Sequence, residues 1–325
     1  MRKADNHIPA AGTGWPGHVE FHLTDEEFEK FSRLIYNTAG IKLAPVKKTM
    51  LSARLQKRVK FLGLANYQEY LQHLLTTEGQ QNEMVFMLDA VSTNKTEFFR
   101  EPAHFRLLTD RILPAIIEHH PAGRPLHLRA WSAGCSSGEE PFTLAMVLEE
   151  FCSHFSWLSY SILATDLCTS VLANAQRAVY EDQKIGSIPK IYRNKYLMRG
   201  VGKRQGLHRV VPELRQKVTF RRLNFMAGEF GLKQPIDILF CRNVLIYFDS
   251  RTRATLFKKF YRHLAPQGYL FIGHSESLEG INDQMLRISS TLFMKKPAPT
   301  REASPLDDNK GREKTAGDDA RAGCQ

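Results

Sequence analysis

One stretch, residues 126–148, constrains the fold of this 325-residue chain more than any other part of it. It reads LHLRAWSAGCSSGEEPFTLAMVL: an apolar run, then a loop of small residues, then a second apolar run with helical spacing. A strand, a small-residue loop and a helix in this order are typical of the first unit of a nucleotide-binding α/β sheet. No Gly-Lys-Ser/Thr follows and the G-x-G-x-x-G spacing is incomplete, so the loop is not a phosphate-binding P-loop.

Two acidic residues, Glu139 and Glu140, open the helix of this unit. Two carboxylates would repel a pyrophosphate and favour a cationic ligand instead. The alternative is that they only stabilise the helix N-terminus, where negative charge is favourable. The sequence does not decide between these readings, nor which of the two residues contacts a ligand.

The composition predicts a cytoplasmic protein with about two domains. Apolar residues make up 42% of the chain, enough for a sizeable core. No apolar run reaches bilayer length and the N-terminus lacks a signal-peptide core. Five scattered cysteines without a CxxC pair predict free thiols in a reducing compartment, and a net charge of +11 predicts an anionic partner.

Residues 21–91 read as a small all-helical domain that follows a polar arm, 1–20, which we expect to be disordered. Thr24 and Glu27 have the spacing of a capping box, and Gly40 is a typical residue to end the first helix. A second helix follows Pro45. Further helices are expected at about 66–76 and 80–91, and no segment of this domain reads as a strand.

The second helix carries dense positive charge. Arg54 and Arg58 are four residues apart and share a face. No acidic residue lies between Lys47 and Lys60 to balance that charge. We therefore expect an anionic partner to dock on Lys47, Arg54, Lys57 and Arg58, with an ordinary solvated helix face as the alternative.

Residues 92–105 form a polar and then aromatic joint, and an α/β pattern follows it. Strands are expected at 160–165, 218–222, 236–240 and 269–272, helices at 103–118, 167–178 and 250–264, and a hairpin at 285–296. Glycines, prolines and basic residues interrupt the pattern at about 180–217, which predicts an inserted β element rather than a crossover helix. The polar tail, 297–325, is expected to be disordered.

Polar side chains follow several strands at the carboxyl edge of the sheet, where such folds bind ligands. Asp166 ends the second strand, a position that accepts both hydroxyls of a ribose, although it could instead cap the next helix. Asn224 and Asn243 follow the third and fourth strands, and His274 near the fifth reads as a loop residue. The set holds no metal-ligand cluster and suits a ligand with a sulfonium and an ammonium group, such as S-adenosylmethionine.

Five motifs together carry a family resemblance: STNKTEFFRE, WSAGCSSGEEP, ATD, CRNVLIYFD and GHSES. Over residues 21–296 they resemble the CheR-type chemotaxis receptor methyltransferases, which are protein-glutamate O-methyltransferases. The resemblance implies a class I S-adenosylmethionine-dependent methyltransferase sheet, Rossmann-like, with a small inserted β-subdomain and a preceding all-α domain. It implies a receptor-docking domain at 21–91, a linker at 92–105 that contributes to the cofactor site, and a methyltransferase domain at 106–296.

The same resemblance implies the site. Its S-adenosylmethionine-binding positions correspond to Asn94, Thr96, Arg100, Glu140, Asp166, Asn224, Phe225, Asn243 and Val244. Arg100 is expected to orient a carboxylate and Tyr247 to line the site, with a structural role as the alternative for each. The expected partners are the cytoplasmic helices of methyl-accepting receptors and a receptor C-terminal peptide at residues 199–202; no metal, nucleic acid or membrane insertion is expected.

Two other functions fit parts of the sequence. A nucleic-acid methyltransferase would suit the positive charge and Asn243 at a strand tip, but such enzymes usually place prolines where Val244 and Leu245 follow here. A non-catalytic module that senses S-adenosylmethionine and docks on receptors would share the same strand-tip residues.

Overall fold

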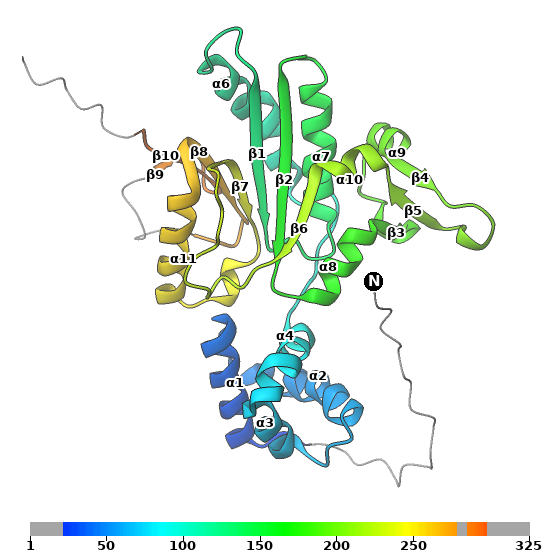
Figure 1. The fold of residues 1–325 in the computed structure, drawn as a ribbon, viewed down its shortest axis with the longest axis vertical. Helices are drawn as coiled ribbons and strands as arrows, with labels where there is room; N and C mark the ends of the chain where they lie inside the picture. The colour runs from blue at the N-terminus through cyan, green and yellow to red at the C-terminus, as the bar shows by residue number, and fades with distance from the viewer. Residues whose placement is uncertain (1–21, 278–284, 298–325) are drawn as a thin grey trace, which may run out of the picture.

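The computed structural model describes residues 22–277 and 285–297 and shows a helical domain beside an α/β domain (Figure 1). The predicted arm at 1–20 and the predicted tail beyond residue 297 lie outside the described residues. None of the described helices has the length and apolar character needed to cross a membrane. The four described cysteines are free thiols, as predicted, and all four are buried.

The helical domain forms as the sequence pattern predicts. Its helices are α1 (Asp25–Ala39), α2 (Lys48–Phe61), α3 (Tyr67–Leu75) and α4 (Met84–Val91), with a 3-10 turn at Pro45–Lys47 and a π-helical turn at Gly79–Glu83. Thr24 and Glu27 make the reciprocal capping box, and Gly40 ends α1 at a φ of 73°. The apolar stripes of α1 and α2 pack together around Phe31 and Leu55, both without exposed surface.

The α/β domain is built on a seven-stranded sheet in the order β6-β2-β1-β7-β8-β10-β9. The strands are β1 (Leu126–Ala133), β2 (Leu158–Asp166), β6 (Val218–Arg222), β7 (Ile236–Cys241), β8 (Leu264–Ile272), β9 (Met285–Arg287) and β10 (Leu292–Lys295). The first five run parallel and β10 is antiparallel to both of its neighbours. The strand order reverses between β1 and β7, which is where ligands bind in open α/β sheets.

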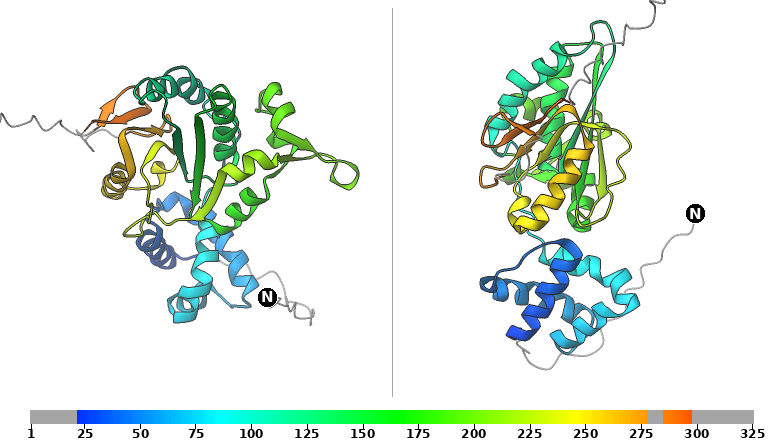
Figure 2. Two further views of the ribbon diagram at one scale, coloured as in Figure 1. Left: turned by 45° about the horizontal axis from the view of Figure 1, so that its top comes forward. Right: turned by 90° about the vertical axis from the view of Figure 1, so that its left-hand side faces the viewer.

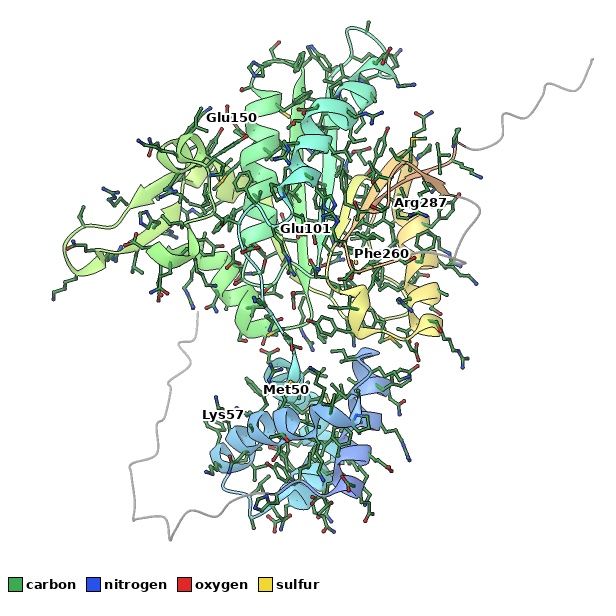
Figure 3. The ribbon with its side chains drawn as sticks, turned by 180° about the vertical axis from the view of Figure 1, so that it is seen from behind. Met50, Lys57, Glu101, Glu150, Phe260 and Arg287 are labelled. Carbon is green, nitrogen blue, oxygen red and sulfur yellow. The ribbon has the colours of Figure 1, made fainter. Side chains whose placement is uncertain are left out.

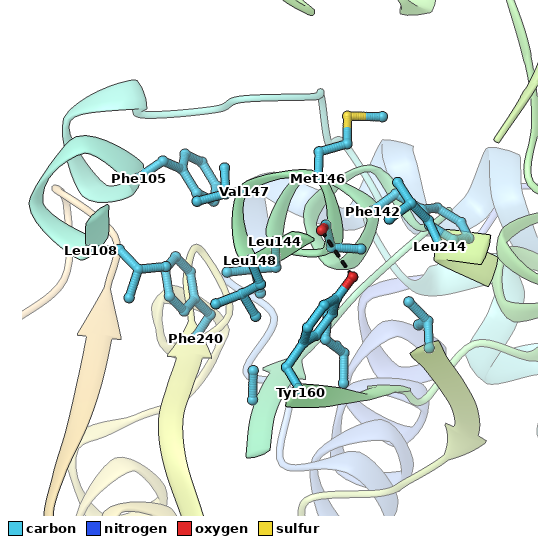
Figure 4. Packing of buried hydrophobic residues seen from close by; sticks show 14 of the residues in the cluster. Phe105, Leu108, Phe142, Leu144, Met146, Val147, Leu148, Tyr160, Leu214 and Phe240 are labelled. Carbon is cyan, nitrogen blue, oxygen red and sulfur yellow. Dashed lines mark hydrogen bonds between the residues drawn. The ribbon is translucent and has the colours of Figure 1, made fainter. Parts of the chain in front are cut away.

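Helices cover both faces of this sheet (Figure 2). They are α5 (Pro102–Leu107), a π-helical turn (Leu108–Ile112), α6 (Leu113–Glu118), α7 (Glu139–Cys152), α8 (Thr169–Arg177) and α11 (Ser250–His263). Alternate residues of β1 enter different cores: Ala130 joins the core under α7 and Trp131 joins the core under α11. In the first core the Tyr160 hydroxyl donates to the Ala145 carbonyl at 3.1 Å, among the apolar side chains of α7 (Figure 4).

The inserted segment holds more helix than its sequence predicted. Its strands β3 (Val179–Glu181), β4 (Leu197–Arg199) and β5 (Leu207–Val210) form an antiparallel sheet in the order β3-β5-β4. Two short helices, α9 (Lys190–Tyr196) and α10 (Pro212–Lys217), were not predicted. Pro189 and Pro212 were read as interruptions, but both lie at helix starts, where proline is favourable.

A second boundary also differs from prediction. The last helix was expected to run to residue 264 and to stop because of Pro266 and Gly268. The helix α11 instead ends at His263, and β8 already begins at Leu264 and contains both residues. A register shift between Ile236 and Ile238 in the β7–β8 pairing accommodates this irregular strand start.

Side-chain contacts join the two domains along the edge of the sheet. The Tyr36 hydroxyl of α1 donates to Asp249 Oδ2 at 2.8 Å, just before α11. The Asn224 amide, after β6, donates to the Thr38 carbonyl at 2.6 Å. These contacts hold the helical domain against the carboxyl ends of the strands.

Candidate functional site

A cavity of about 530 Å³ lies between the two domains, at the carboxyl ends of β1, β2, β6 and β7. Its walls come from the segment between α1 and α2, the linker, the loop after β1 and the strand tips. Figure 3 shows the two domains meeting at this level, with Met50, a lining residue, at the top of the helical domain. All nine predicted cofactor positions and Tyr247 line this cavity: Asn94, Thr96, Arg100, Glu140, Asp166, Asn224, Phe225, Asn243 and Val244.

Asp166 is held at the tip of β2 by two backbone donors. Its Oδ2 accepts from the Ser136 N–H at 2.8 Å and its Oδ1 from the Cys168 N–H at 2.9 Å. Burial raises the pKa of Asp166, although these hydrogen bonds oppose the shift. A carboxylate has about four acceptor positions, so these two hydrogen bonds leave capacity for a ligand. The alternative role as helix cap does not hold, because Cys168 occupies the N-cap position of α8.

The structure separates the two acidic residues at the start of α7. Glu140 lines the cavity and its Oε1 accepts from the Ser132 hydroxyl at 2.7 Å. Burial raises the pKa of Glu140, against the pull of the nearby guanidinium of Arg242. Glu139 does not line the cavity, and its Oε1 lies 2.9 Å from the ammonium of Lys184. Glu140 is therefore the member of the pair that faces the cavity.

Arg242 is a cavity residue that the sequence reasoning missed. Its side chain is only 1% exposed, and its Nε lies 3.6 Å from both Glu101 Oε2 and Glu140 Oε2. Its Nη2 donates to the Arg100 carbonyl at 2.6 Å. The sequence indicated that Glu139 and Glu140 together would favour a cationic ligand. This interpretation is corrected, because Glu139 does not line the cavity and Glu140 already lies beside positively charged Arg242. Arg242 directly follows β7 in the CRN motif, but the sequence does not indicate which carboxylates surround it.

Asn243 has the backbone and side-chain features of a ligand contact. Its φ of 59° is left-handed, which is uncommon outside glycine. Its Oδ1 is buried without a hydrogen-bond partner among the described residues. A buried acceptor left unpaired costs about 1–3 kcal/mol, so this oxygen fits a ligand that brings a donor.

Close packing of two loops shapes the same wall. Gly134 has a φ of 89°, and a Cβ there would lie 2.4 Å from Val244 Cγ2. The absence of a side chain lets the β1 loop pass close to the segment after β7. The cavity wall therefore brings acidic and amide groups from several strand tips together, and this set of groups fits S-adenosylmethionine.

Glu276, also missed from the sequence, fixes the loop that carries Asn243. Its carboxylate accepts from the backbone N–H groups of Gly273 at 2.6 Å, Leu245 at 2.7 Å and Asn243 at 3.0 Å. It lies in the GHSES motif and is 7% exposed. Its role is to position the strand-tip segment rather than to line the cavity.

The two predicted catalytic residues both lie on the cavity wall. Arg100 donates to the Lys95 carbonyl at 3.2 Å, a contact within the linker. The Tyr247 hydroxyl lies 3.5 Å from the Thr93 carbonyl, and burial raises the pKa of Tyr247, so it is protonated at neutral pH. Asn224 lines the same cavity, but its amide already bonds Thr38 and the turn at Met226. Its side chain is thus committed to holding the domains together.

The basic helix α2 is less available than its sequence indicated. Arg54 donates to two backbone carbonyls at the end of α4, at 2.6 and 3.0 Å. Arg58 pairs with both oxygens of Glu83, at 2.8 and 2.7 Å. The argument that nothing balances this charge is therefore wrong for Arg58, because the acid comes from the turn before α4. Lys47 and Lys57 are exposed, and docking on this helix remains a prediction.

Comparisons with known proteins agree with the division into two domains. The family model for the CheR methyltransferase all-alpha domain matches residues 26–92, and that for the CheR methyltransferase SAM binding domain matches residues 94–294. A chemotaxis protein methyltransferase of Borreliella burgdorferi is 38% identical over 81% of this chain and 92% of its own length. Chemotaxis protein methyltransferase 2 of Pseudomonas aeruginosa is 36% identical over 85% of this chain and 95% of its own. The Escherichia coli chemotaxis protein methyltransferase is 36% identical over 83% and 91%.

Proposed function

The chain belongs to the CheR methyltransferase family, and we propose that it esterifies glutamate side chains of chemotaxis receptors with the methyl group of S-adenosylmethionine. The products are glutamate methyl esters and S-adenosylhomocysteine. The observation that carries the proposal is a cavity at the reversal of strand order, lined by acidic, amide and cationic side chains from both domains.

Four residues are proposed to hold the cofactor. Asp166 accepts the ribose hydroxyls with the acceptor capacity that its backbone donors leave unused. Glu140 attracts the ammonium of the methionine portion. Asn243 Oδ1, which has no partner among the described residues, accepts from a ligand donor, and the Gly134 backbone forms part of the cavity wall beside the ligand.

The reaction requires the protein to align the two reactants and does not require it to transfer a proton. When bound, S-adenosylmethionine supplies a methyl group activated by its sulfonium. A glutamate side chain with an ordinary pKa of ~4.3 is already ionised near pH 7 and needs no general base. The cavity walls then align the carboxylate oxygen with the methyl group and exclude water.

Arg100 and Tyr247 are the proposed catalytic residues. Arg100 is a cavity-lining cation and can pair with the incoming carboxylate and orient it. Tyr247 keeps its proton at neutral pH, because burial raises its pKa, so its hydroxyl can donate to the same carboxylate. Arg242, shared between two carboxylates, holds the Arg100 carbonyl and so steadies the linker.

Two surfaces are proposed for the receptor. The exposed ammonium groups of Lys47 and Lys57 would attract anionic receptor helices and speed encounter. The loop between β4 and β5 carries Val201, which is 81% exposed, and would take a receptor C-terminal peptide. Lys57 and Val201 lie outside the cofactor cavity, which Lys47 lines, so these two residues can be altered separately from it.

Methyl transfer to defined acceptors tests the proposal. The full chain is incubated with labelled S-adenosylmethionine and a receptor cytoplasmic fragment, duplex DNA or RNA, and base-labile methanol release is measured. We expect methanol release from the receptor fragment alone. Label on nucleic acid but not on receptor would replace the proposal with a nucleic-acid methyltransferase. Tight S-adenosylhomocysteine binding without ester formation would indicate a sensor module.

A further inference from the structure

Three residues with metal-binding side chains meet beside the cavity. Glu101 precedes α5, His104 lies within α5, and His274 follows β8. Glu101 Oε2 lies 3.3 Å from His104 Nδ1 and 3.9 Å from His274 Nε2. All three ligand atoms lie within 4.8 Å of one another. This cluster was not predicted from the sequence, because His274 is distant in the chain from Glu101 and His104.

Two of these atoms are buried and make no hydrogen bond within the part of the chain that the structure describes. Among the described residues, neither His104 Nδ1 nor Glu101 Oε2 has a hydrogen-bond partner. The His104 side chain is only 2% exposed, so water does not readily satisfy its nitrogen. Unpaired buried polar atoms cost about 1–3 kcal/mol each, and a shared bound ion would satisfy both.

The other ring nitrogen of His104 is already held. Its Nε2 lies 2.8 Å from the hydroxyl of Thr291. An imidazole that binds a metal through one nitrogen usually gives its other N–H to such a partner, which fixes the ring and its tautomer.

We propose that Glu101, His104 and His274 bind a divalent first-row transition metal, with Zn²⁺ as the representative ion. Two imidazoles and one carboxylate form a ligand set found in zinc sites that keep a fourth position open. Zinc–ligand bonds of about 2.1 Å place neighbouring ligand atoms about 3.4 Å apart in a tetrahedron, close to the Glu101–His104 separation. Mg²⁺ prefers an all-oxygen octahedron and should not compete.

His274, the third proposed ligand, can complete the tetrahedral geometry. The His274 side chain is 57% exposed and sits on a loop, so its ring can turn toward Glu101. Its ring already lies near that of His104, with 5.1 Å between centroids. Arg242 Nε lies 3.6 Å from both Glu101 and Glu140, so its charge is shared between two carboxylates, which limits repulsion of a metal. This site is independent of the proposed methyl transfer.

Metal titration tests the site. Untagged full-length protein is stripped with a chelator, and Zn²⁺ and Mg²⁺ are titrated by calorimetry. We expect one equivalent of Zn²⁺ to bind and Mg²⁺ to give no saturable heat. His274→Ala should weaken Zn²⁺ binding by about tenfold or more, as should Glu101→Gln. His154→Ala, an exposed histidine on the turn after α7, is the matched control and should bind as the wild type does.

Co²⁺ spectra identify the ligands. The wild-type protein should give visible ligand-field bands without a thiolate charge-transfer band, and His274→Ala should lose them. Circular dichroism checks that the variants fold. We expect His274→Ala to fold, because the His274 side chain is largely exposed. Equal Zn²⁺ affinity in wild type and His274→Ala, no saturable Zn²⁺ binding, or a thiolate–Co²⁺ band would each overturn the proposal.

Discussion

Asp89 of α4 accepts a hydrogen bond from the backbone N–H of Thr169, the first residue of α8, at 2.9 Å. Its other oxygen accepts from the Thr169 hydroxyl and from the Ser170 N–H, both at 2.8 Å. A side chain of the helical domain therefore caps a helix of the α/β domain. Because the cavity lies between these domains, the cap helps to fix the position of its helical wall.

Asp89→Ala should weaken this contact between the two domains. Loss of a helix cap costs about 1 kcal/mol, and the interdomain contact is lost with it. We expect a lower melting temperature and about fivefold weaker binding of S-adenosylhomocysteine, measured by calorimetry. Glu118→Ala, at the end of α6 and remote from the helical domain, is the control (Figure 1). Unchanged ligand affinity in Asp89→Ala would show that the cap does not shape the cavity.

Glu139 and Glu140 offer a matched pair of substitutions. Glu140→Gln removes a charge from the cavity wall and should weaken S-adenosylhomocysteine binding by about tenfold, since hydrogen bonds to charged groups contribute about 1.5–3 kcal/mol. Glu139→Gln removes the pairing with Lys184 instead and should lower the melting temperature while keeping ligand affinity. Calorimetry and thermal unfolding measure both effects. The reverse pattern would mean that Glu139 is the contact.

Cofactor affinity should fall at acidic pH through Asp166. Burial and the nearby charge of Asp89 raise the pKa of Asp166, so its carboxylate takes up a proton at a higher pH than an ordinary aspartate. Ribose hydroxyls donate to the ionised carboxylate. The affinity for S-adenosylhomocysteine should therefore be highest above the pKa of Asp166 and should fall as the pH drops through that pKa. Titrations of S-adenosylhomocysteine across pH measure this.

A comparison of variants isolates the contribution of Asp166. Glu140 titrates in the same direction, because burial raises its pKa as well. Asp166→Asn should bind more weakly at neutral pH and show a shallower pH dependence than the wild type. A pH profile identical in shape for both proteins would assign the titration to another group.

Sequence reasoning succeeded where the signal is local. The capping box at Thr24, the strand ending at Asp166 and the strand-tip position of Asn243 follow from neighbouring residues and strand periodicity. It missed Arg242 and Glu276, because their roles depend on which loops meet at the sheet edge. A buried arginine is recognised only once the carboxylates on both sides of it are known.

The same limit explains the errors at α2 and in the insertion. Glu83, which pairs with Arg58, is separated from it by a whole helix, so the local charge count overestimated the free charge. A proline that interrupts a segment and a proline that begins a helix cannot be told apart from composition, so Pro189 and Pro212 were read as interruptions. Only the packing of Tyr196 and Leu214 into the core favours the helices there.

Reversing the charge of Arg58 and reversing that of its neighbour Lys57 on α2 should therefore have different effects on stability. Arg58 pairs with buried Glu83 and lies over the rings of Phe61 and Phe86, so Arg58→Glu should destabilise the domain by about 3 kcal/mol. Lys57 is exposed, so Lys57→Glu should leave the melting temperature and S-adenosylhomocysteine affinity unchanged.

Receptor methylation provides the matching functional test for Lys57. If α2 meets an anionic receptor helix, Lys57→Glu should slow methylation several-fold at low ionic strength, and the difference should narrow as salt screens the encounter. Lys258→Glu makes the same charge change on the exposed side of α11 and should methylate at the wild-type rate. Equal slowing by both variants would indicate a general effect of net charge, and no slowing by Lys57→Glu would remove α2 as the docking surface.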